Sequence, residues 1–366
     1  MAKEHSFEMY GHPSIYNPKT RKLKIYFSEP YNGVNDSTGI LLLIAGFGGN
    51  ANSNVYKKMR TYFADNHNLV VVQCDYFGWE FMQKPNNISI NINKTELLKT
   101  FSKSEVNYIF QDNNFWERLL EVANKYNYNI FCSEILDENL SNFNDMGIMQ
   151  AIDNISAVIC IMEIIKDNCY KFNRNKIIIY GHSHGAYLAY LCNAFAPNLF
   201  SLIIDNSAWL FPIYLKHNSY VNSRYKNIVI STQYSYLART LNYDEEILYL
   251  PFLYKKFKNN CNIICYHGTD DKLISNVDKK QFAKYVDKFT YNEISHDKID
   301  NKVFRSTSHG LNADFIKMYD YVMENNKIDF DENKIMKLET VKYYTKERQY
   351  CIDYSNKIPH LTILDT

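Results

Sequence analysis

The centre of the chain carries an apolar, strand-like run that leads into a short glycine-bounded turn, Ile177-Ile178-Ile179-Tyr180-Gly181-His182-Ser183-His184-Gly185. A helix-forming stretch, residues 186–196, comes next. A strand, the pattern Gly-x-Ser-x-Gly and a helix, in this order, are typical of a nucleophile elbow. The two glycines allow a sharp turn and a close approach of neighbouring elements. The order therefore predicts that Ser183 projects its hydroxyl into a cleft at the carboxyl end of the strand.

Outward from this turn, the chain alternates between predicted strands and predicted helices. Strands are expected at residues 22–27, 39–44, 69–73, 177–180, 202–205, 262–267 and 289–294. Helices are expected at residues 53–66, 147–168, 186–196, 276–288 and 311–324. Repeated strand–helix units with short connections predict an α/β fold, with a mostly parallel central sheet and helices on both sides.

Three segments interrupt or follow this alternation. Residues 78–146 are polar and rich in asparagine, which indicates an insertion near the active-site mouth. Residues 209–260 contain many tyrosines and no glycine, and we expect them to form a cap. Residues 326–366 form a C-terminal extension in which residues 336–344 and 348–354 could pair as a β-hairpin. The prediction is thus one domain over residues 1–366 with two insertions and an extension.

A serine nucleophile needs a general base within hydrogen-bond reach and an acid that orients the base. On this type of fold the acid follows the serine in sequence and the histidine comes last. The segment His267-Gly268-Thr269-Asp270-Asp271 directly follows a predicted strand. Its form places the acid at Asp271, with Asp270 as the alternative. Asp205, at the end of the preceding strand, is a second alternative acid.

The base is expected at His309, which lies between the last predicted strand and the closing helix. A glycine follows His309, and the closing helix begins immediately afterwards. His296 follows the same strand and is the alternative base.

The tetrahedral intermediate of acyl transfer carries an oxyanion that backbone N–H groups must stabilise. One donor is expected at His184, at the start of the elbow helix, and the other at Phe47, with Gly48 as the alternative. The glycine-rich loop that carries Phe47 lacks the Gly-Lys-Ser/Thr of a phosphate-binding loop. At the last position of the pattern G-x-G-x-x-G, counted from Gly46, it has Ala51 in place of glycine, and we do not expect nucleotide binding.

Arg305 lies four residues before His309 in a chain with few arginines. A guanidinium close to the site could bind a substrate carboxylate through paired donors. Arg305 is therefore a candidate substrate-binding residue, and a purely structural arginine is the alternative.

The formal net charge of +1 and the pI of about 7.6 do not favour nucleic acid or an anionic membrane as a partner. The amino terminus is polar and lacks a secretory signal, and the eight cysteines show no disulfide framework or metal-binding pattern. We expect a cytoplasmic protein without a cofactor or a metal, and the oligomeric state stays open.

These motifs, across about residues 20–325, resemble the α/β-hydrolase superfamily, most closely its esterase and prolyl-oligopeptidase-like branches. Many esterases have a histidine before the oxyanion glycines, where this chain has Ala45. The stretch Ser308 to Asp314 and the asparagine- and tyrosine-rich insertions also resemble a hydrolase-like family of ε-proteobacteria. Members of that family often lie near flagellin-glycosylation loci. This second resemblance implies an acylated, nonulosonic-acid-type sugar as a substrate class.

The function expected from the sequence is that of a serine hydrolase that cleaves an ester of a small molecule or a glycan through an acyl-enzyme on Ser183. An acyltransferase that passes the acyl group to a sugar or alcohol is the first alternative, because both reactions share the acyl-enzyme. A non-catalytic binding protein on a hydrolase scaffold is the second.

Overall fold

The computed structural model describes residues 1–82, 87–90, 92–330 and 338–365, and the chain divides into two compact units. Unit 1 comprises Met1–Met82, Leu140–Ile213 and Asn242–Thr366, and unit 2 comprises Gln83–Asn139 and Tyr214–Leu241.

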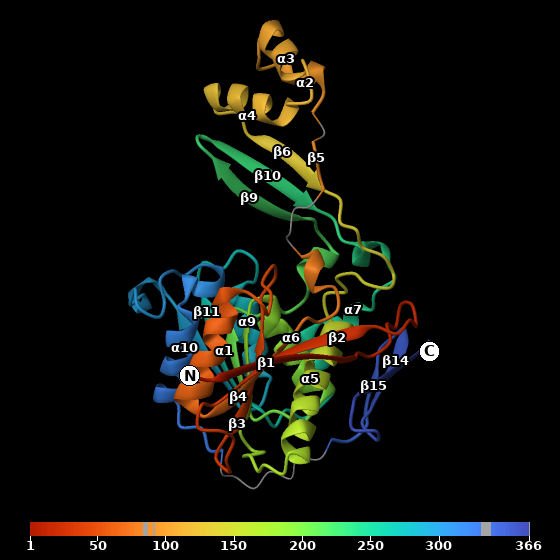
Figure 1. Cartoon of the computed structure of the whole chain (residues 1–366), viewed down its shortest axis with the longest axis vertical. Helices are drawn as coiled ribbons and strands as arrows, with labels where there is room; N and C mark the ends of the chain where they lie inside the picture. The colour runs from red at the N-terminus through yellow and green to blue at the C-terminus, as the bar shows by residue number, and fades with distance from the viewer. Residues whose placement is uncertain (83–86, 91, 331–337, 366) are drawn as a thin grey trace. The chain divides into compact units, whose positions relative to one another are not determined.

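Unit 1 is built on an eight-stranded sheet in the order β1-β2-β4-β3-β7-β8-β11-β12. Figure 1 labels β1, β2, β3, β4 and β11 of this sheet. From β4 onward every neighbouring pair is parallel, and β2 pairs antiparallel with both β1 and β4. The strand bounds are β1 Lys3–Tyr10, β2 Lys22–Glu29, β3 Gly39–Ile44, β4 Leu69–Cys74, β7 Ile177–His182, β8 Leu202–Asn206, β11 Asn262–Gly268 and β12 Phe289–Ile294.

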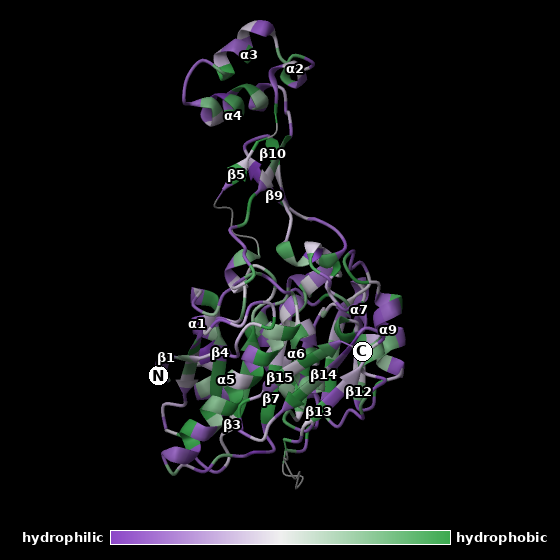
Figure 2. Cartoon of the chain, turned by 90° about the vertical axis from the view of Figure 1, so that its right-hand side faces the viewer, coloured by the Kyte–Doolittle hydropathy of each residue, from purple (hydrophilic) through white to green (hydrophobic). Residues whose placement is uncertain are grey.

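Helices cover both faces of this sheet. On one face, α1 (Asn54–His67) and α10 (Phe315–Asn325) share a buried apolar cluster with side chains of β3, β4, β7, β8 and β11. The other face is packed by α5 (Ile148–Asp167), α6 (His184–Phe195) and α9 (Asn276–Lys284). Figure 2 shows apolar residues gathered on α5, α6 and the neighbouring strands. The predicted α/β-hydrolase fold is confirmed.

The shorter elements of unit 1 connect these layers. They are η1 Trp79–Phe81, α7 Glu245–Leu248, α8 Leu250–Leu253, η4 His296–Lys298 and η5 His309–Asn312. The short helix η2, Ile213–Leu215, lies where the chain passes from unit 1 to unit 2.

Among the described residues, α5 alone is long and apolar enough to cross a membrane by length and composition. The most apolar window of α5 is 83% buried inside the protein. A mostly buried helix of this kind is typical of the core of a globular unit.

The carboxyl of Asp145 lies buried just before α5 and accepts hydrogen bonds from the N–H groups of Gly147 (3.3 Å) and Met149 (2.7 Å). Burial raises the pKa of Asp145 from its ordinary value of 3.8 to about 7, although these two hydrogen bonds oppose the shift. A folded-state pKa above the unfolded value means that folding favours the protonated carboxyl.

We therefore expect this contribution to stability to be complete below about pH 4 and to be lost as the pH rises through 7. Relative to the wild type, the variant Asp145→Asn should gain stability as the pH rises, by at most about 1.4 kcal/mol per pH unit. Urea unfolding of both proteins from pH 5 to pH 8 measures the difference. A difference that does not change with pH would contradict the shifted pKa.

Unit 2 has its own sheet and its own core. Its strands, in the order β5-β6-β10-β9, are β5 Ile88–Ser89, β6 Ile130–Glu134, β10 Ile228–Tyr234 and β9 Ser219–Tyr225. Its helices are α2 Lys94–Leu97, α3 Lys103–Ile109, α4 Phe115–Lys125 and η3 Leu237–Thr240. Side chains of α2, α3, α4, β6 and β10 form one buried apolar cluster.

The two predicted insertions thus contribute to one unit, because β6 from the first pairs in parallel with β10 from the second. Both ends of each insertion, residues 78–82, 140–146, 209–213 and 242–260, belong to unit 1. Residues 83–86 and 91 of the first insertion lie outside the described part of the chain. The placement of these insertions at the active-site mouth and as a cap stays a prediction.

The C-terminal extension forms a three-stranded antiparallel sheet of β13 (Val341–Tyr344), β14 (Arg348–Asp353) and β15 (His360–Asp365). The pair β13–β14 corresponds to the segments for which the sequence indicates a hairpin, although residues 336 and 337 are not described. The hydroxyls of Tyr343 and Tyr354 donate to the carbonyl oxygens of Ala194 (2.6 Å) and Phe195 (2.7 Å). Both carbonyls belong to the last turn of α6, where the helix itself offers them no partner.

Candidate active site

Ser183 lies at the junction between β7 and α6, in a backbone conformation with φ 55° and ψ −120°. A residue other than glycine rarely adopts such a conformation, and it persists only where the surroundings enforce it. The Ser183 N–H donates to the carbonyl oxygen of Asn206 at 2.8 Å, and the Ser183 carbonyl accepts from the N–H of Tyr187 at 3.0 Å. The turn is therefore tied on one side to β8 and on the other to α6.

The two glycines of the elbow are required by close backbone contacts. A Cβ at Gly181 would lie 2.5 Å from the backbone nitrogen of Ala186, and one at Gly185 would lie 2.2 Å from the carbonyl oxygen of Ile44. The neighbouring atoms in both cases are backbone atoms, which cannot move aside cheaply.

We expect Gly185→Ala to lower the free energy of unfolding by about 3 kcal/mol, because the added methyl group forces α6 away from the end of β3. Gly33→Ala is the matched control, because a Cβ at Gly33 meets nothing within 4 Å and the cost is only that of its φ of 81°, about 1 kcal/mol. Urea denaturation measures both. Equal losses in the two variants would disprove the packing argument.

The structure brings Ser183, His309 and Asp271 together in a hydrogen-bonded chain. The Oγ of Ser183 lies 2.7 Å from Nε2 of His309, and Nδ1 of His309 lies 2.7 Å from Oδ2 of Asp271. With its proton on Nδ1, the imidazole donates to Asp271 and accepts from the Ser183 hydroxyl. This is the arrangement in which an imidazole can remove the serine proton while the carboxylate orients it.

Asp271 is held as a carboxylate. Burial alone would raise its pKa, but the hydrogen bond and electrostatic interaction with His309, together with His267 and the N–H of Ile274, outweigh burial and leave the pKa below its ordinary value. Its Oδ1 also accepts from the N–H groups of Leu273 (2.9 Å) and Ile274 (3.1 Å). These bonds fix the carboxylate orientation towards His309.

The alternative residues lie elsewhere in the network. Asp270 and His296 pair with each other, with Nε2 of His296 3.1 Å from Oδ2 of Asp270, and both side chains are largely exposed. Asp205 forms a buried ion pair with Lys279 at 2.8 Å and accepts a hydrogen bond from the Tyr190 hydroxyl at 2.6 Å. The Asp205 carboxylate is thus bound by Lys279 and Tyr190.

The loop that carries Phe47 lies against the elbow. The ring centroids of Phe47 and His184 are 5.6 Å apart, and a Cβ at Gly46 would lie 2.9 Å from the carbonyl oxygen of His182. The N–H of Gly48 donates to the thioether sulfur of Met82 at 3.2 Å. The two expected oxyanion donors, His184 and Phe47, therefore come from segments that are in contact.

Two further histidines flank Ser183 in the sequence, and both are kept neutral. Burial lowers the pKa of His182 to about 4, and the nearby His309 adds to this effect. Burial lowers the pKa of His184 to about 3. The Nε2 of His184 lies 2.6 Å from Oε1 of Gln150, so the imidazole donates to this amide. Neither side chain is a charged group at neutral pH.

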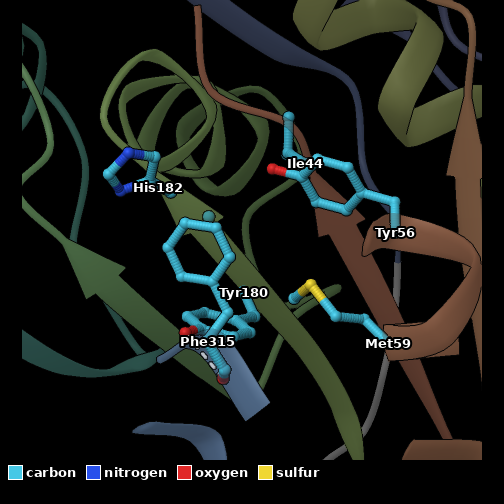
Figure 3. A pocket seen from close by; sticks show the side chains of 7 residues that line it. Ile44, Tyr56, Met59, Tyr180, His182 and Phe315 are labelled. Atoms are coloured by element: carbon cyan, nitrogen blue, oxygen red, sulfur yellow. Dashed lines mark hydrogen bonds between the residues drawn. The ribbon is translucent and has the colours of Figure 1, made fainter. Parts of the chain in front are cut away.

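A small pocket lies behind the elbow, between α1, α10 and the sheet. Figure 3 shows the side chains that line it, from Ile44, Tyr56, Met59, Tyr180, His182 and Phe315. Its volume, about 10 Å³, is at the lower limit for one water molecule. Ser183 does not line this pocket, which is too small to be the substrate site.

Arg305 lies in the loop before His309, and its guanidinium is 3.6 Å from the carboxylate of Asp314. Its side chain is 41% exposed. A substrate carboxylate would compete with Asp314 for this guanidinium, so the assignment of Arg305 to substrate binding stays a prediction.

Several residues around the site were not identified from the sequence. Lys279, which neutralises Asp205, is a fully buried lysine in an otherwise ordinary amphipathic helix and gives no sequence signal. Asn206 and Ser207 follow a predicted strand directly, and polar residues at the carboxyl ends of parallel strands are a signal for a site.

Two protein families match parts of the chain. Residues 5–221 match DUF2920, which is described as a protein of unknown function. Residues 152–326, which include the elbow, the acid and the histidine, match the prolyl oligopeptidase family. None of the curated proteins compared with the chain matches it.

Several solved structures are similar to this chain at low sequence identity. Est1E from Butyrivibrio proteoclasticus, with ferulic acid bound, is 13% identical over 86% of this chain and 96% of its own, with a TM-score of 0.45. An esterase from Thermogutta terrifontis, with butyrate bound, is 14% identical over 86% of this chain and 92% of its own, with a TM-score of 0.43. An acylaminoacyl peptidase is 11% identical over 92% of this chain and 42% of its own, with a TM-score of 0.49.

Proposed function

The chain belongs to the DUF2920 family, and we propose that it is a serine hydrolase that cleaves an ester through an acyl-enzyme on Ser183. The observation that carries the proposal is the pair of 2.7 Å contacts that link Ser183 to His309 and His309 to Asp271. The match of residues 152–326 to the prolyl oligopeptidase family supports a serine hydrolase as the class.

In the proposed reaction, Nε2 of His309 takes the proton of the Ser183 hydroxyl as Oγ attacks the acyl carbonyl carbon. The N–H groups of His184 and Phe47 stabilise the oxyanion of the tetrahedral intermediate. His309 then returns its proton to the leaving alcohol, which leaves the acyl group on Ser183. A water molecule, deprotonated by the same imidazole, releases the acid and restores the hydroxyl. Asp271 orients the imidazole throughout and stabilises the imidazolium that forms at each proton transfer.

The proposed substrate is an ester of a small molecule or a glycan. The narrower assignment, an acylated nonulosonic-acid-type sugar, rests on the resemblance to the ε-proteobacterial family. A cytoplasmic location belongs to the same proposal.

A panel of p-nitrophenyl esters of increasing acyl length, together with acylated sugars, tests this proposal. We expect turnover of at least one ester with release of free acid, and irreversible labelling of the folded protein by a fluorophosphonate probe. If an added acceptor alcohol becomes acylated at the expense of free acid, the enzyme is an acyltransferase. If the folded protein shows neither turnover nor labelling, the chain is a binding protein and the proposal is wrong.

A further inference from the structure

Strand β8 ends beside the elbow, and its last residue holds the nucleophile. In the parallel register between β7 and β8, His182 pairs with Asn206. The carbonyl oxygen of Asn206 accepts the N–H of Ser183 at 2.8 Å. The backbone of Asn206 therefore fixes the strained peptide from which the Ser183 side chain projects.

The same residue and its neighbour also hold the peptide that follows the base. The Nδ2 of Asn206 donates to the carbonyl oxygen of Gly310 at 3.3 Å, and the N–H of Gly310 donates to Oγ of Ser207 at 3.1 Å. The Ser207 hydroxyl donates in turn to Oδ1 of Asn206 at 3.2 Å. Asn206 and Ser207 are completely buried, so water does not compete for these bonds.

The turn that Asn206 and Ser207 hold is strained and needs anchoring. Gly310, Leu311 and Asn312 all have left-handed φ values, of 74°, 59° and 42°. Such a conformation costs about 1–2 kcal/mol for each residue other than glycine. Gly310 is also pressed against the ring of His182, because a Cβ there would lie 2.4 Å from Cε1 of that histidine. If these contacts were lost, we expect the turn to relax to a less strained backbone conformation and to displace His309, which directly precedes it.

His309 is thus placed between two anchors. On its amino-terminal side, the N–H of Asp270 donates to the carbonyl oxygen of Thr307 at 2.9 Å, next to the acid of the site. On its carboxyl-terminal side, the contacts to Asn206 and Ser207 tie the turn to the same strand end that holds Ser183.

We infer that Asn206 and Ser207 are positioning residues, which set the distance between Ser183 Oγ and Nε2 of His309 by holding both segments to the end of β8. This inference rests on the proposed hydrolase function and adds two residues to it. Neither side chain is expected to touch the substrate or to move a proton. Their loss should therefore lower the rate of serine attack and leave substrate binding nearly unchanged.

Two single-residue variants of the full chain test this inference. Asn206→Ala removes the donor to Gly310. Ser207→Gly removes the hydroxyl, and glycine tolerates the Ser207 φ of 60° without strain. For both variants we expect kcat and the rate of fluorophosphonate labelling to fall about 10²-fold, the usual effect of an ångström-scale misplacement. KM should change by less than about threefold, because the binding groups remain in place.

Asn193→Ala is the matched control. Asn193 is a buried asparagine near the far end of α6 whose Nδ2 donates to Tyr254 Oη (3.0 Å) and Asn259 Oδ1 (2.9 Å). It should lower the melting temperature as much as Asn206→Ala does, with kcat close to that of the wild type.

Three results would overturn the inference. The first is a folded Asn206→Ala or Ser207→Gly variant with a wild-type kcat and labelling rate. The second is a loss of kcat no larger than that of Asn193→Ala. In both cases a labelled wild type leaves the hydrolase proposal intact. The third is a folded wild type that no fluorophosphonate labels, which removes the hydrolase proposal and this inference together.

Discussion

Ser183→Ala is expected to abolish covalent labelling by a fluorophosphonate probe and to lower the kcat for ester hydrolysis by about 10⁴- to 10⁶-fold. The variant removes the only oxygen that lies within hydrogen-bond distance of Nε2 of His309 in the described part of the chain. The remaining donors could still bind an ester but could not form the acyl-enzyme. Probe labelling followed by mass spectrometry of the intact protein, and initial rates with the best ester of the panel, measure the effect.

The fold should survive this change. Alanine at position 183 would adopt the same φ of 55° as serine. It would also keep the hydrogen bond to Asn206, because this bond joins two backbone groups. Ser156→Ala is a suitable control, because Ser156 is a buried serine of α5 whose hydroxyl donates to the carbonyl oxygen of Ile152 at 2.7 Å. It should label like the wild type. Persistent labelling of Ser183→Ala would show that another residue is the nucleophile.

Asp271→Asn is expected to lower kcat by about 10³- to 10⁴-fold with little change in stability. The amide has the shape of the carboxylate, but it can present its NH₂ group to Nδ1 of His309. The imidazole would then carry its proton on Nε2, where it can no longer accept the proton of Ser183. The kcat and KM of the folded variant, with the ester used for the wild type, give the measurement.

Asp270→Asn provides the comparison within the same turn. The Asp270 carboxylate accepts from the hydroxyl of Thr307 and pairs with the exposed His296, with no contact to His309. Its replacement should change kcat by less than about tenfold, since exposed ion pairs contribute little. If Asp270→Asn shows the large loss of kcat and Asp271→Asn the small one, Asp270 is the acid that orients His309.

The sequence predicted those parts of the site whose positions are marked by neighbouring residues in the chain. The elbow needs glycines because backbone atoms approach positions 181 and 185 closely. The pattern Gly-x-Ser-x-Gly has its two glycines at these positions. Asp271 follows the apolar strand β11, and His309 lies between the alternating strand β12 and the closing helix α10. The carboxyl ends of parallel strands meet at one edge, so chain order alone brings these residues near Ser183.

The parts that the sequence did not predict depend on contacts between distant segments. Asp205 lies near the end of its strand, as a candidate acid would, but it pairs with the buried amino group of Lys279 and accepts from the Tyr190 hydroxyl. Strand β1 is an edge strand of mostly exposed residues, so it lacks the apolar run that marked the other strands. The sheet of unit 2 gave no signal because β5 and β6 are short, and because β6 also pairs with β10 from the other insertion.

The parallel pairing of β6 with β10 also has a consequence for biosynthesis. A ribosome releases residues 83–139 well before residues 214–241, so unit 2 lacks two of its four strands while the elbow of unit 1 is still being made. During that interval β6 presents an unpaired edge, and Phe131, already 66% exposed in the finished protein, lies on it. Open strand edges in nascent chains favour aggregation. Until β10 is made, unit 2 therefore carries an open strand edge of this kind.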